Sequence, residues 1–356
     1  MRRYGLIAGL VAAAAAVALA AAPAGAAVTW TVVPAPPPSV AVWAAVSART
    51  DSDAWAIAIG SRTTPLIARW NGTAWSQVTG PTVTGAISPV PDAVSASSAS
   101  DAWLVGRTSK LHQTSALAAH WNGTSWSVVA VPSGGSLLRS VVDISPTVAY
   151  AVGNTAAVQW NGTSWSAFAV PAPGGAAPVN LDAVAGDSAS DVWITGQYFD
   201  TATSADEPFT AHWNGATWAS VPVPVNGAEL FGLTVISPSV AWAVGNNLNG
   251  TAFTENWNGS SWQVVPNPAQ GLLLSVTATG AGNVTAVGHN TTANGPTAAI
   301  IISWNGSSWV NDSVPVVGAT EELFSASAAP GGTITWALGS STSSAGAVSS
   351  LLLRNG

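Results

Sequence analysis

The sequence predicts an all-β fold in which one four-stranded sheet is repeated seven times around a closed, single-domain ring. Three observations predict it. The hexapeptide Trp-Asn-Gly-x-x-Trp occurs six times, a second short motif precedes each copy, and the two chain ends together supply most of a seventh copy. The composition agrees, because 48% of the 356 residues are hydrophobic and 7% are charged, against roughly 25% charged residues in an ordinary globular domain.

The hexapeptides set the repeat length. They begin at Trp70, Trp121, Trp160, Trp213, Trp257 and Trp304. The upstream motif reads Asp53-Ala54-Trp55 in the first unit and recurs with substitutions in all seven units. A period of about 40–50 residues is typical of the four-stranded blades of β-propellers. We therefore predict a seven-bladed β-propeller with four strands in each blade.

The seventh hexapeptide is expected to be divided between the chain ends. The chain finishes Arg354-Asn355-Gly356, which we align with Trp-Asn-Gly, and Trp30 supplies the final tryptophan. A repeat that is cut at its turn predicts a closed ring, in which an N-terminal strand over residues 28–33 pairs with residues 349–353. Closure removes the sheet edges that would otherwise invite aggregation.

The second unit illustrates the strands expected in each blade. Alternation and turn residues place them at residues 92–97, 102–106, 117–121 and 125–131. Asn-Gly is the strongest two-residue hairpin signal, because both central positions of a type I′ turn need a positive φ. With Asn122-Gly123 as that turn, Trp121 would lie opposite Thr124 and diagonal to Trp126. The turn also accounts for the Asn-Gly-Thr/Ser tripeptides, which are otherwise acceptors for N-glycosylation.

Eighteen of the 19 tryptophans occupy repeat positions, and Trp43 alone does not. Sheets that pack face to face around an axis need broad apolar side chains, so we expect these indoles to form the core between blades. Stacking on sugar rings is the alternative role. The aspartates before the second strand, Asp53, Asp101 and Asp191, are expected to cap their own turns, with calcium binding as the alternative.

Residues 1–26 have the pattern of a signal peptide. Arg2 and Arg3 precede an apolar run from Leu6 to Leu19, and residues 24–26 (Ala-Gly-Ala) match an A-x-A cleavage site. We therefore expect a secreted, extracellular protein in which residues 27–356 form one propeller domain. No second apolar run approaches the about 18 residues that a spanning helix needs, so no membrane span is expected in the mature chain.

The composition excludes several classes of function. With no cysteine, the chain cannot form disulfide scaffolds, cysteine-ligated zinc sites or a thiol nucleophile. A single lysine and a net charge of −7 argue against nucleic acid as a partner. Glycosidases need two carboxylates facing one bond, whereas the neighbours Asp206 and Glu207 point apart on an extended chain, as do Glu321 and Glu322. We therefore expect no enzyme activity, no cofactor and no bound metal.

The connections between the second and third strands are where the repeats diverge. They collect much of the scarce polar chemistry, and variable polar loops on a rigid scaffold are common binding positions. The candidate ligand-binding residues are Arg107, Lys110, His112, Gln113, Gln197, Tyr198, Asp200, Asp206, Glu207, Asn246, Asn247, His289 and Asn290.

The hexapeptides, together with the Val-Ala-Trp-Ala-Val-Gly sequence of residues 240–245, carry a family resemblance. The chain resembles secreted bacterial seven-bladed β-propellers of the Kelch and Asp-box kind and bacterial propeller lectins. It lacks the Ser-x-Asp of the Asp-box, so sialidase membership is not implied. The lectin resemblance implies sugar binding between or at the ends of blades. We therefore expect non-catalytic recognition with glycans as the preferred ligand; a scaffold for extracellular protein partners and a polysaccharide-acting enzyme are the alternatives.

Overall fold

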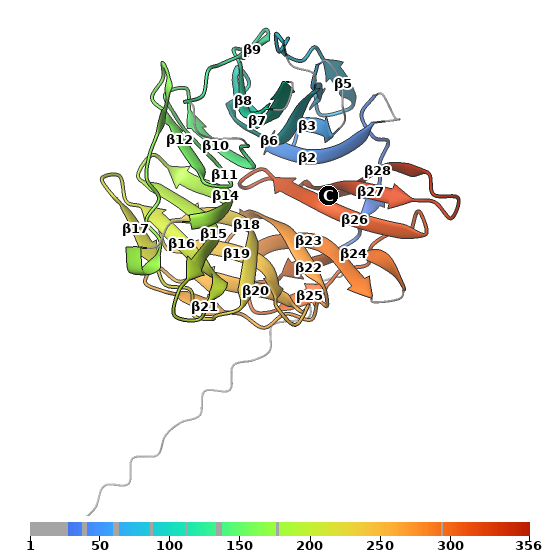
Figure 1. Cartoon of the computed structure of the whole chain (residues 1–356). Coiled ribbons are helices and arrows are strands. Elements are labelled where there is room, and N and C mark those ends of the chain that lie inside the picture. Colours follow the sequence, from blue (N-terminus) through green and yellow to red (C-terminus); the bar gives the residue numbers. More distant parts are fainter. Residues whose placement is uncertain are drawn as a thin grey trace, which may run out of the picture.

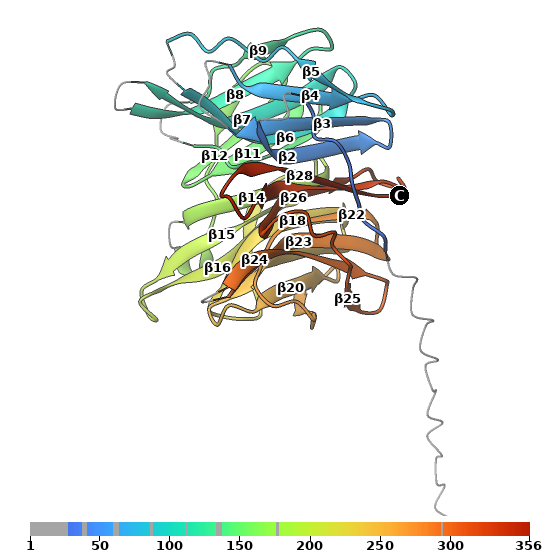
Figure 2. The same ribbon diagram turned by 90° about the vertical axis from the view of Figure 1, so that its right-hand side faces the viewer.

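The computed structural model describes residues 28–37, 41–59, 64–85, 88–110, 113–132, 137–175, 178–292 and 295–356. The expected signal peptide lies outside these residues. Within them, the strands form seven four-stranded antiparallel sheets, which confirms the predicted seven-bladed propeller. The blades follow one another in chain order around a central axis, so that the blue first blade lies beside the red last blade (Figures 1 and 2).

We call the strands of each blade a to d, from the axis outward. Blade 1 contains β2 (Val42–Thr50), β3 (Asp53–Ile59), β4 (Leu66–Trp70) and β5 (Trp75–Val78). Blade 2 contains β6 (Ser88–Ser98), β7 (Asp101–Lys110), β8 (Gln113–Trp121) and β9 (Trp126–Val128). Blade 3 contains β10 (Ser140–Ser145), β11 (Val148–Gly153), β12 (Ala156–Trp160) and β13 (Trp165–Ala167), followed by the short 3-10 helix η1 (Pro173–Gly175).

The remaining blades repeat this order. Blade 4 contains β14 (Pro178–Ser188), β15 (Asp191–Asp200), β16 (Ala205–Trp213) and β17 (Trp218–Val221). Blade 5 contains β18 (Ala228–Ser237), β19 (Val240–Asn247), β20 (Ala252–Trp257) and β21 (Trp262–Val264). Blade 6 contains β22 (Leu272–Gly280), β23 (Asn283–Thr292), β24 (Gly295–Trp304) and β25 (Trp309–Asn311). Blade 7 contains β26 (Thr320–Ala328), β27 (Thr335–Thr342) and β28 (Val348–Asn355), with β1 (Thr31–Val32) as its fourth strand.

The N-terminal strand closes the ring, as predicted, but the alignment of the split hexapeptide was wrong by one residue. Thr31 pairs with Arg354, and Trp336 of strand b also pairs with Arg354. In blade 1 the corresponding partner of Trp55 is Arg69, the residue before the hexapeptide. Arg354 therefore matches Arg69, and Asn355 stands where the other blades have their first tryptophan. The C-terminal Asn-Gly was matched to the Asn-Gly of the hexapeptides, but the register of strand c is fixed by strand pairing and not by residue identity.

Groups of three indoles fill most of the interfaces between blades. Trp55 of blade 1 packs against Trp121 and Trp126 of blade 2, with ring centroids 5.2 and 5.3 Å apart. The same arrangement closes the ring, where Trp336 of blade 7 packs against Trp70 of blade 1 at 5.2 Å. Edge-to-face geometry at these separations is favourable beyond the burial of the rings. The expected core role of these tryptophans is confirmed.

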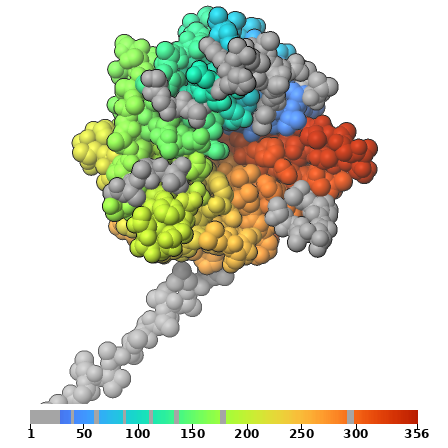
Figure 3. All heavy atoms as spheres, in the orientation of Figure 1, coloured from blue at the N-terminus to red at the C-terminus, as the bar shows by residue number. Residues whose placement is uncertain are grey.

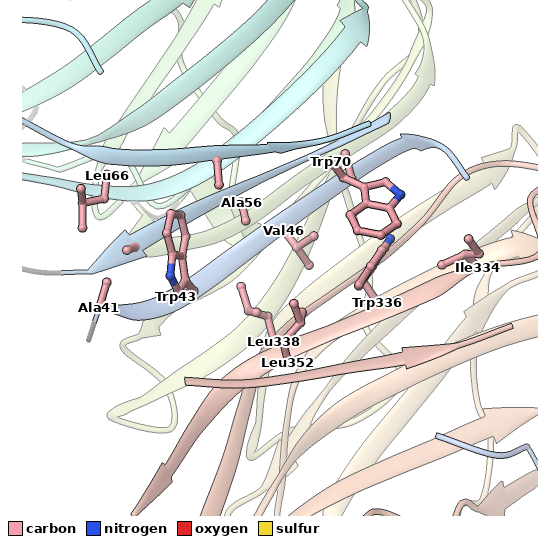
Figure 4. Packing of buried hydrophobic residues seen from close by; sticks show 13 residues of the cluster. Ala41, Trp43, Val46, Ala56, Leu66, Trp70, Ile334, Trp336, Leu338 and Leu352 are labelled. Carbon is pink, nitrogen blue, oxygen red and sulfur yellow. The ribbon is translucent and has the colours of Figure 1, made fainter. Parts of the chain in front are cut away.

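Trp43, which the repeat pattern leaves unexplained, is also part of this core. Its side chain is fully buried between blades 7 and 1, in the same cluster as Trp70 and Trp336. Figure 4 shows Trp70 and Trp336 together at one end of this interface, with Trp43 at the other end near Ala41 and Leu66. Trp43 therefore adds apolar area where the last blade meets the first.

The hexapeptide turns differ from the expected type I′ geometry. Trp121 pairs directly with Trp126 across a loop of four residues, and only the glycine, Gly123, has a positive φ there, of 94°. The Asn122 side chain closes the loop, because its Oδ1 accepts the N–H groups of Thr124 and Ser125, both at 3.0 Å, and the Thr124 hydroxyl at 2.8 Å. The hydroxyl residue after Asn-Gly thus has a structural partner, although this does not test glycosylation.

Replacing Asn122 with alanine is expected to lower the free energy of unfolding by about 1–2 kcal/mol, because two backbone N–H groups lose their acceptor. Thr124→Ala removes only the hydroxyl contact and is the matched control. The equivalent fourth-blade position is naturally Ala216, so the control is expected to cost less. Urea unfolding of the three proteins measures the difference. Equal losses for both variants would contradict the proposed closing role of Asn122.

The aspartates that begin strand b hold strand c, in addition to the expected contacts across their own turns in blades 1 and 2. Asp53 accepts from Arg69 Nε at 2.7 Å, and Asp101 and Asp191 form hydrogen bonds with His120 and His212 at 2.6 and 2.7 Å. Each basic side chain directly precedes a hexapeptide in its own blade. The turn-capping prediction was therefore incomplete. Asp53 and Asp101 accept from Arg49 Nε and the Ser97 hydroxyl across their own turns, and all three carboxylates also bind a charged or aromatic nitrogen donor of strand c.

A β-bulge shapes the inner strand of the blades. In six of the described inner strands the register shifts at the same position, where one additional residue is inserted. In blade 3, Arg139 holds this position directly before β10 and donates its N–H to Val152 O at 2.7 Å. The bulge brings strand a so close to strand b that a Cβ added to Gly245 would overlap the carbonyl oxygen of Glu229. This accounts for the glycine at the end of the Trp-Ala-Val-Gly sequence of residues 242–245.

Candidate functional site: the mouth of the central cavity

The variable b–c connections extend their blades as β-hairpins, where the sequence analysis treated them as loops. In blade 2 the pairing continues to Lys110 and Gln113, and in blade 4 it continues to Asp200 and Ala205. These hairpins lie on one face of the ring, which we call the b–c face. It is on the left in Figure 2, opposite the C-terminus, and is turned toward the viewer in Figure 1.

The structure brings four of the predicted residues to equivalent positions and leaves the others apart from them. Each of the four directly follows the glycine of strand b that lies beside the inner bulge. They are Arg107, Gln197, Asn246 and His289. They therefore occupy the same place in blades 2, 4, 5 and 6. Gln113, Tyr198, Asp200 and Asp206 lie farther out on the hairpins, as does the backbone of Lys110, and His112 lies outside the described residues.

Several predicted residues form hydrogen bonds within the protein, among them Glu207, Asn247 and Asn290. Glu207 is buried, and its Oε2 accepts the Gly227 N–H at 2.9 Å, which ties the blade 4 hairpin to the approach to blade 5. Asn247 Nδ2 donates to Thr251 Oγ1 at 3.0 Å, and Asn290 Oδ1 accepts the Ala298 N–H at 2.7 Å. Asn247 and Asn290 thus stabilise their own connections, whereas Glu207 links two blades.

A central cavity of about 360 Å³ lies on the axis. Each blade contributes to the cavity wall three consecutive residues that begin with its bulge residue, and blade 2 also contributes Pro91. Seen as spheres from the same side as Figure 1, the coloured blades converge near the centre of the molecule (Figure 3). The seven bulge residues, which we call the bulge ring, are Ala44, Asp92, Arg139, Asp182, Phe231, Leu274 and Phe324.

The bulge ring has two chemically distinct arcs. Blades 2, 3 and 4 contribute the charged residues Asp92, Arg139 and Asp182, whereas blades 5, 6 and 7 contribute Phe231, Leu274 and Phe324. All of the apolar members are partly exposed to the cavity. A pocket with an apolar wall and a few convergent polar groups is the usual form of a ligand site.

Neighbouring side chains orient the charged arc. Arg107 Nη1 lies 3.3 Å from Asp92 Oδ1, and Arg139 Nη2 donates to Asn154 Oδ1 at 3.3 Å. Asn180 Nδ2 donates to Asp182 Oδ1 at 2.8 Å. Burial raises the pKa of Asp92, an effect that the charges of Arg107 and Arg139 oppose. Burial also raises the pKa of Asp182 to about 6, against the opposing charge of Arg139. Both carboxylates therefore sit where removal from water is only partly compensated.

Exposed apolar side chains also lie in the connections of the b–c face. Leu248 in the blade 5 connection is 72% exposed, and Val316 before blade 7 is 83% exposed. Phe199 on the blade 4 hairpin and Val348 on the blade 7 hairpin are exposed by 45% and 55%. Apolar surface gathered on one face of a rigid scaffold is typical of interaction sites.

The bulge ring itself was not among the predicted site residues. Its members share no residue type, so no motif repeats at this position. The signal that could have located it is the glycine of strand b, which recurs at Gly106, Gly153, Gly196, Gly245, Gly288 and Gly339.

In the described residues, no group of three or more His, Cys, Asp or Glu side chains is arranged to hold a metal ion. The helical structure that is described contains nothing long and apolar enough to cross a membrane.

No protein-family model matches the chain, and no curated protein matches it. Several solved structures are similar in fold. YCF48 bound to D1 peptide has a TM-score of 0.60 and 16% identity, over 92% of this chain and 96% of that chain. YCF48 from Cyanidioschyzon merolae has a TM-score of 0.59 and 15% identity, with 93% and 98% covered. The RRP9 WD40 repeats have a TM-score of 0.63 and 12% identity, also with 93% and 98% covered. At these identities the similarity establishes the fold alone.

Proposed function

We propose that this chain is a non-catalytic recognition protein that binds an extended segment of a partner protein at the mouth of its central cavity. The observation that carries the proposal is the bulge ring, in which the apolar residues Phe231, Leu274 and Phe324 lie beside a charged arc at the edge of a cavity of about 360 Å³. An extended segment presents both side chains and backbone hydrogen-bonding groups, which suits such a divided surface. The propeller described as YCF48 bound to D1 peptide offers a precedent of peptide binding on this fold.

A non-catalytic role is part of this proposal. Asp206 and Glu207 are adjacent in strand c of the blade 4 hairpin, where they pair with Phe199 and Tyr198 of strand b. Glu207 is buried against Gly227, so the two do not face one bond as glycosidase carboxylates must. We also propose that the protein acts outside the cell, on the basis of the signal-peptide pattern of residues 1–26.

Screening the purified protein against a library of short capped peptides tests the main proposal. We expect a subset of peptides to bind, and Phe231→Ala and Phe324→Ala to weaken binding by roughly tenfold each, because each removes an aromatic contact. Val128→Ala is the matched control, because Val128 is 44% exposed on the outer strand of blade 2, away from the cavity. The proposal would be overturned if no peptide in the library bound, or if Val128→Ala weakened binding as much as the two phenylalanine variants.

Glycan binding is the second candidate. It is favoured by Phe199, an aromatic side chain that is 45% exposed on the same hairpin as Asp200 and Asp206. Aromatic faces and carboxylates together can hold a sugar ring, whereas most of the tryptophans are enclosed between blades. Glycan-array signal that disappears in Phe199→Ala would support this function. A blank array together with peptide binding would favour the protein partner.

A further inference from the structure

The boundary between the two arcs of the bulge ring has hydrogen-bond acceptors without donors. Asp182 of blade 4 uses Oδ1 to accept from Asn180 at 2.8 Å, but its Oδ2 is buried and has no partner. Asn246 of blade 5 donates from Nδ2 to Asn247 O at 3.2 Å, which orients the amide. Its Oδ1 is likewise buried and unpaired. Leaving a buried acceptor unsatisfied costs about 1–3 kcal/mol, so such a pair of acceptors needs an explanation.

A third acceptor, Glu229, lies beside these two. Glu229 pairs with Asn246 across β18 and β19, so the two side chains are neighbours on the sheet. Its charge also raises the pKa of Asp182, which places the two carboxylates within electrostatic range of each other. Glu229 itself is partly exposed, so it can be reached from the b–c face.

The nearest cation does not neutralise this cluster fully. Arg139 lowers the pKa of Asp182 by its charge, but its guanidinium donates to Asn154, at 3.3 Å from Nη2 and 3.4 Å from Nε. The cation that acts on Asp182 thus directs its hydrogen bonds to Asn154 rather than to this carboxylate. Because the pKa of Asp182 is raised only to about 6, this group is ionised at neutral pH.

The geometry points to a slot for a cationic side chain, an arginine or a lysine of the partner segment, between Asp182, Glu229 and Asn246. This inference rests on the proposed peptide-binding function and specifies the chemistry of its ligand. A guanidinium or ammonium group offers several N–H donors and no acceptor, which complements three acceptors. Phe231 is the bulge residue of the same blade as Glu229, so the residue next to the cation would meet the apolar arc.

The overall charge of the chain favours the same partner. Its formal net charge is −7, and an excess of negative charge increases the encounter rate of a basic segment at low ionic strength. Binding at this slot is therefore expected to weaken as salt is added, because screening reduces the attraction between partly exposed charges.

The test uses the short peptides that bind in the capped library, with both termini neutral so that only side chains carry charge. We expect binders to contain arginine or lysine, and replacement of that residue by citrulline or norleucine to weaken binding about tenfold. In the protein, Asp182→Asn and Glu229→Gln are each expected to weaken binding of the original basic peptide about tenfold. The same two variants should bind the citrulline or norleucine peptide almost as the wild-type protein does.

Glu322→Gln is the matched control. Glu322 holds in blade 7 the position that Glu229 holds in blade 5, since each carbonyl lies against the glycine of strand b. We expect this variant to bind like the wild type, and thermal unfolding checks that all variants are folded. Glu229→Gln keeps the test decisive if Asp182→Asn is unstable. Peptide binding without preference for basic residues, or without response to Glu229→Gln, would overturn the slot alone. A library with no binders would overturn the proposed function instead.

Discussion

Removal of the N-terminal strand is expected to lower the melting temperature of the protein by roughly 10 °C. The main loss is Trp30, which is 3% exposed and belongs to the core cluster between blades 6 and 7. Loss of a buried tryptophan typically costs about 3–5 kcal/mol. Its Nε1 also donates to Asp312 Oδ2 at 2.9 Å, so the deletion removes a donor from a carboxyl group that is partly buried.

The interface between blades 6 and 7 depends on Trp30 more than the other interfaces depend on any one indole. Thr285 of blade 6 and Asn355 of blade 7 stand where other blades provide indoles, so this interface has no group of three tryptophans. Trp30 is the one hexapeptide-type indole that remains there. Its removal would also expose β28 as a sheet edge, which favours aggregation.

The comparison is between a chain that starts at Val28 and one that starts at residue 35, both followed by circular dichroism during heating. Trp30→Ala in the longer chain should reproduce most of the loss. Val32→Ala is the control, because that side chain belongs to the same strand but is 49% exposed. If the chain without the strand melts at the same temperature as the longer chain, closure by β1 does not stabilise the ring.

Replacing Glu255 with glutamine is expected to stabilise the protein at alkaline pH and to flatten the pH dependence of its stability. Glu255 lies in strand c of blade 5 and is fully buried, with neither carboxyl oxygen hydrogen-bonded. It stands between Phe253 and Trp257 on the face that packs toward blade 4. Burial raises the pKa of this carboxyl group from 4.5 to about 8, because an apolar site disfavours the charged form.

The sign of the effect follows from proton binding. Between pH 4.5 and about 8, the unfolded chain has released the Glu255 proton while the folded chain keeps it. The free energy of unfolding therefore falls as the pH rises through this window. The contribution is fully present below the unfolded pKa and is lost as pH rises through the folded pKa. The full span of the shift corresponds to roughly 5 kcal/mol of stability. Glutamine does not titrate, so the variant does not show this loss.

Urea unfolding at pH 5, 7 and 9 measures the prediction. The variant should resemble the wild type at pH 5 and exceed it at pH 9. Glu322→Gln, a substitution of a partly exposed glutamate, is the control and should keep the wild-type slope. Burial also raises the pKa of Asp143 to about 7 and of Asp182 to about 6. Because both groups remain in every variant, the difference between proteins isolates Glu255. Parallel pH profiles for wild type and Glu255→Gln would contradict the prediction.

The architecture could be predicted from the sequence because each blade repeats its own local signals. The Trp-Asn-Gly-x-x-Trp copies marked the outer hairpins, and the position of Trp30 near the start marked the closing strand. Details that depend on pairing could not be obtained in this way. The match of Arg354 to Arg69 became visible only through their common strand partners. Similarly, the closing role of Asn122 depends on a side-chain oxygen, which a backbone turn preference does not describe.

The candidate site was predicted only in part, for a related reason. Arg107, Gln197, Asn246 and His289 were identified because polar residues are scarce in this chain. The bulge ring was not predicted because its residues differ in type, from the small Ala44 to the charged Arg139, and have no common chemistry. Sequence repeats reveal positions that must be alike in every blade, whereas the cavity wall is built from positions that differ.

The inner bulge separates what the ring needs for folding from what its centre presents to a ligand. In six blades the strand b glycine is required by the close approach of the strand a backbone, whereas the bulge residue lines the cavity. Seven neighbouring positions are therefore free to differ in size and charge, as Asp92 and Phe231 already do. A scaffold of this kind can acquire a new binding preference one substitution at a time, because each change alters the cavity wall without disturbing the packing of the blades around it.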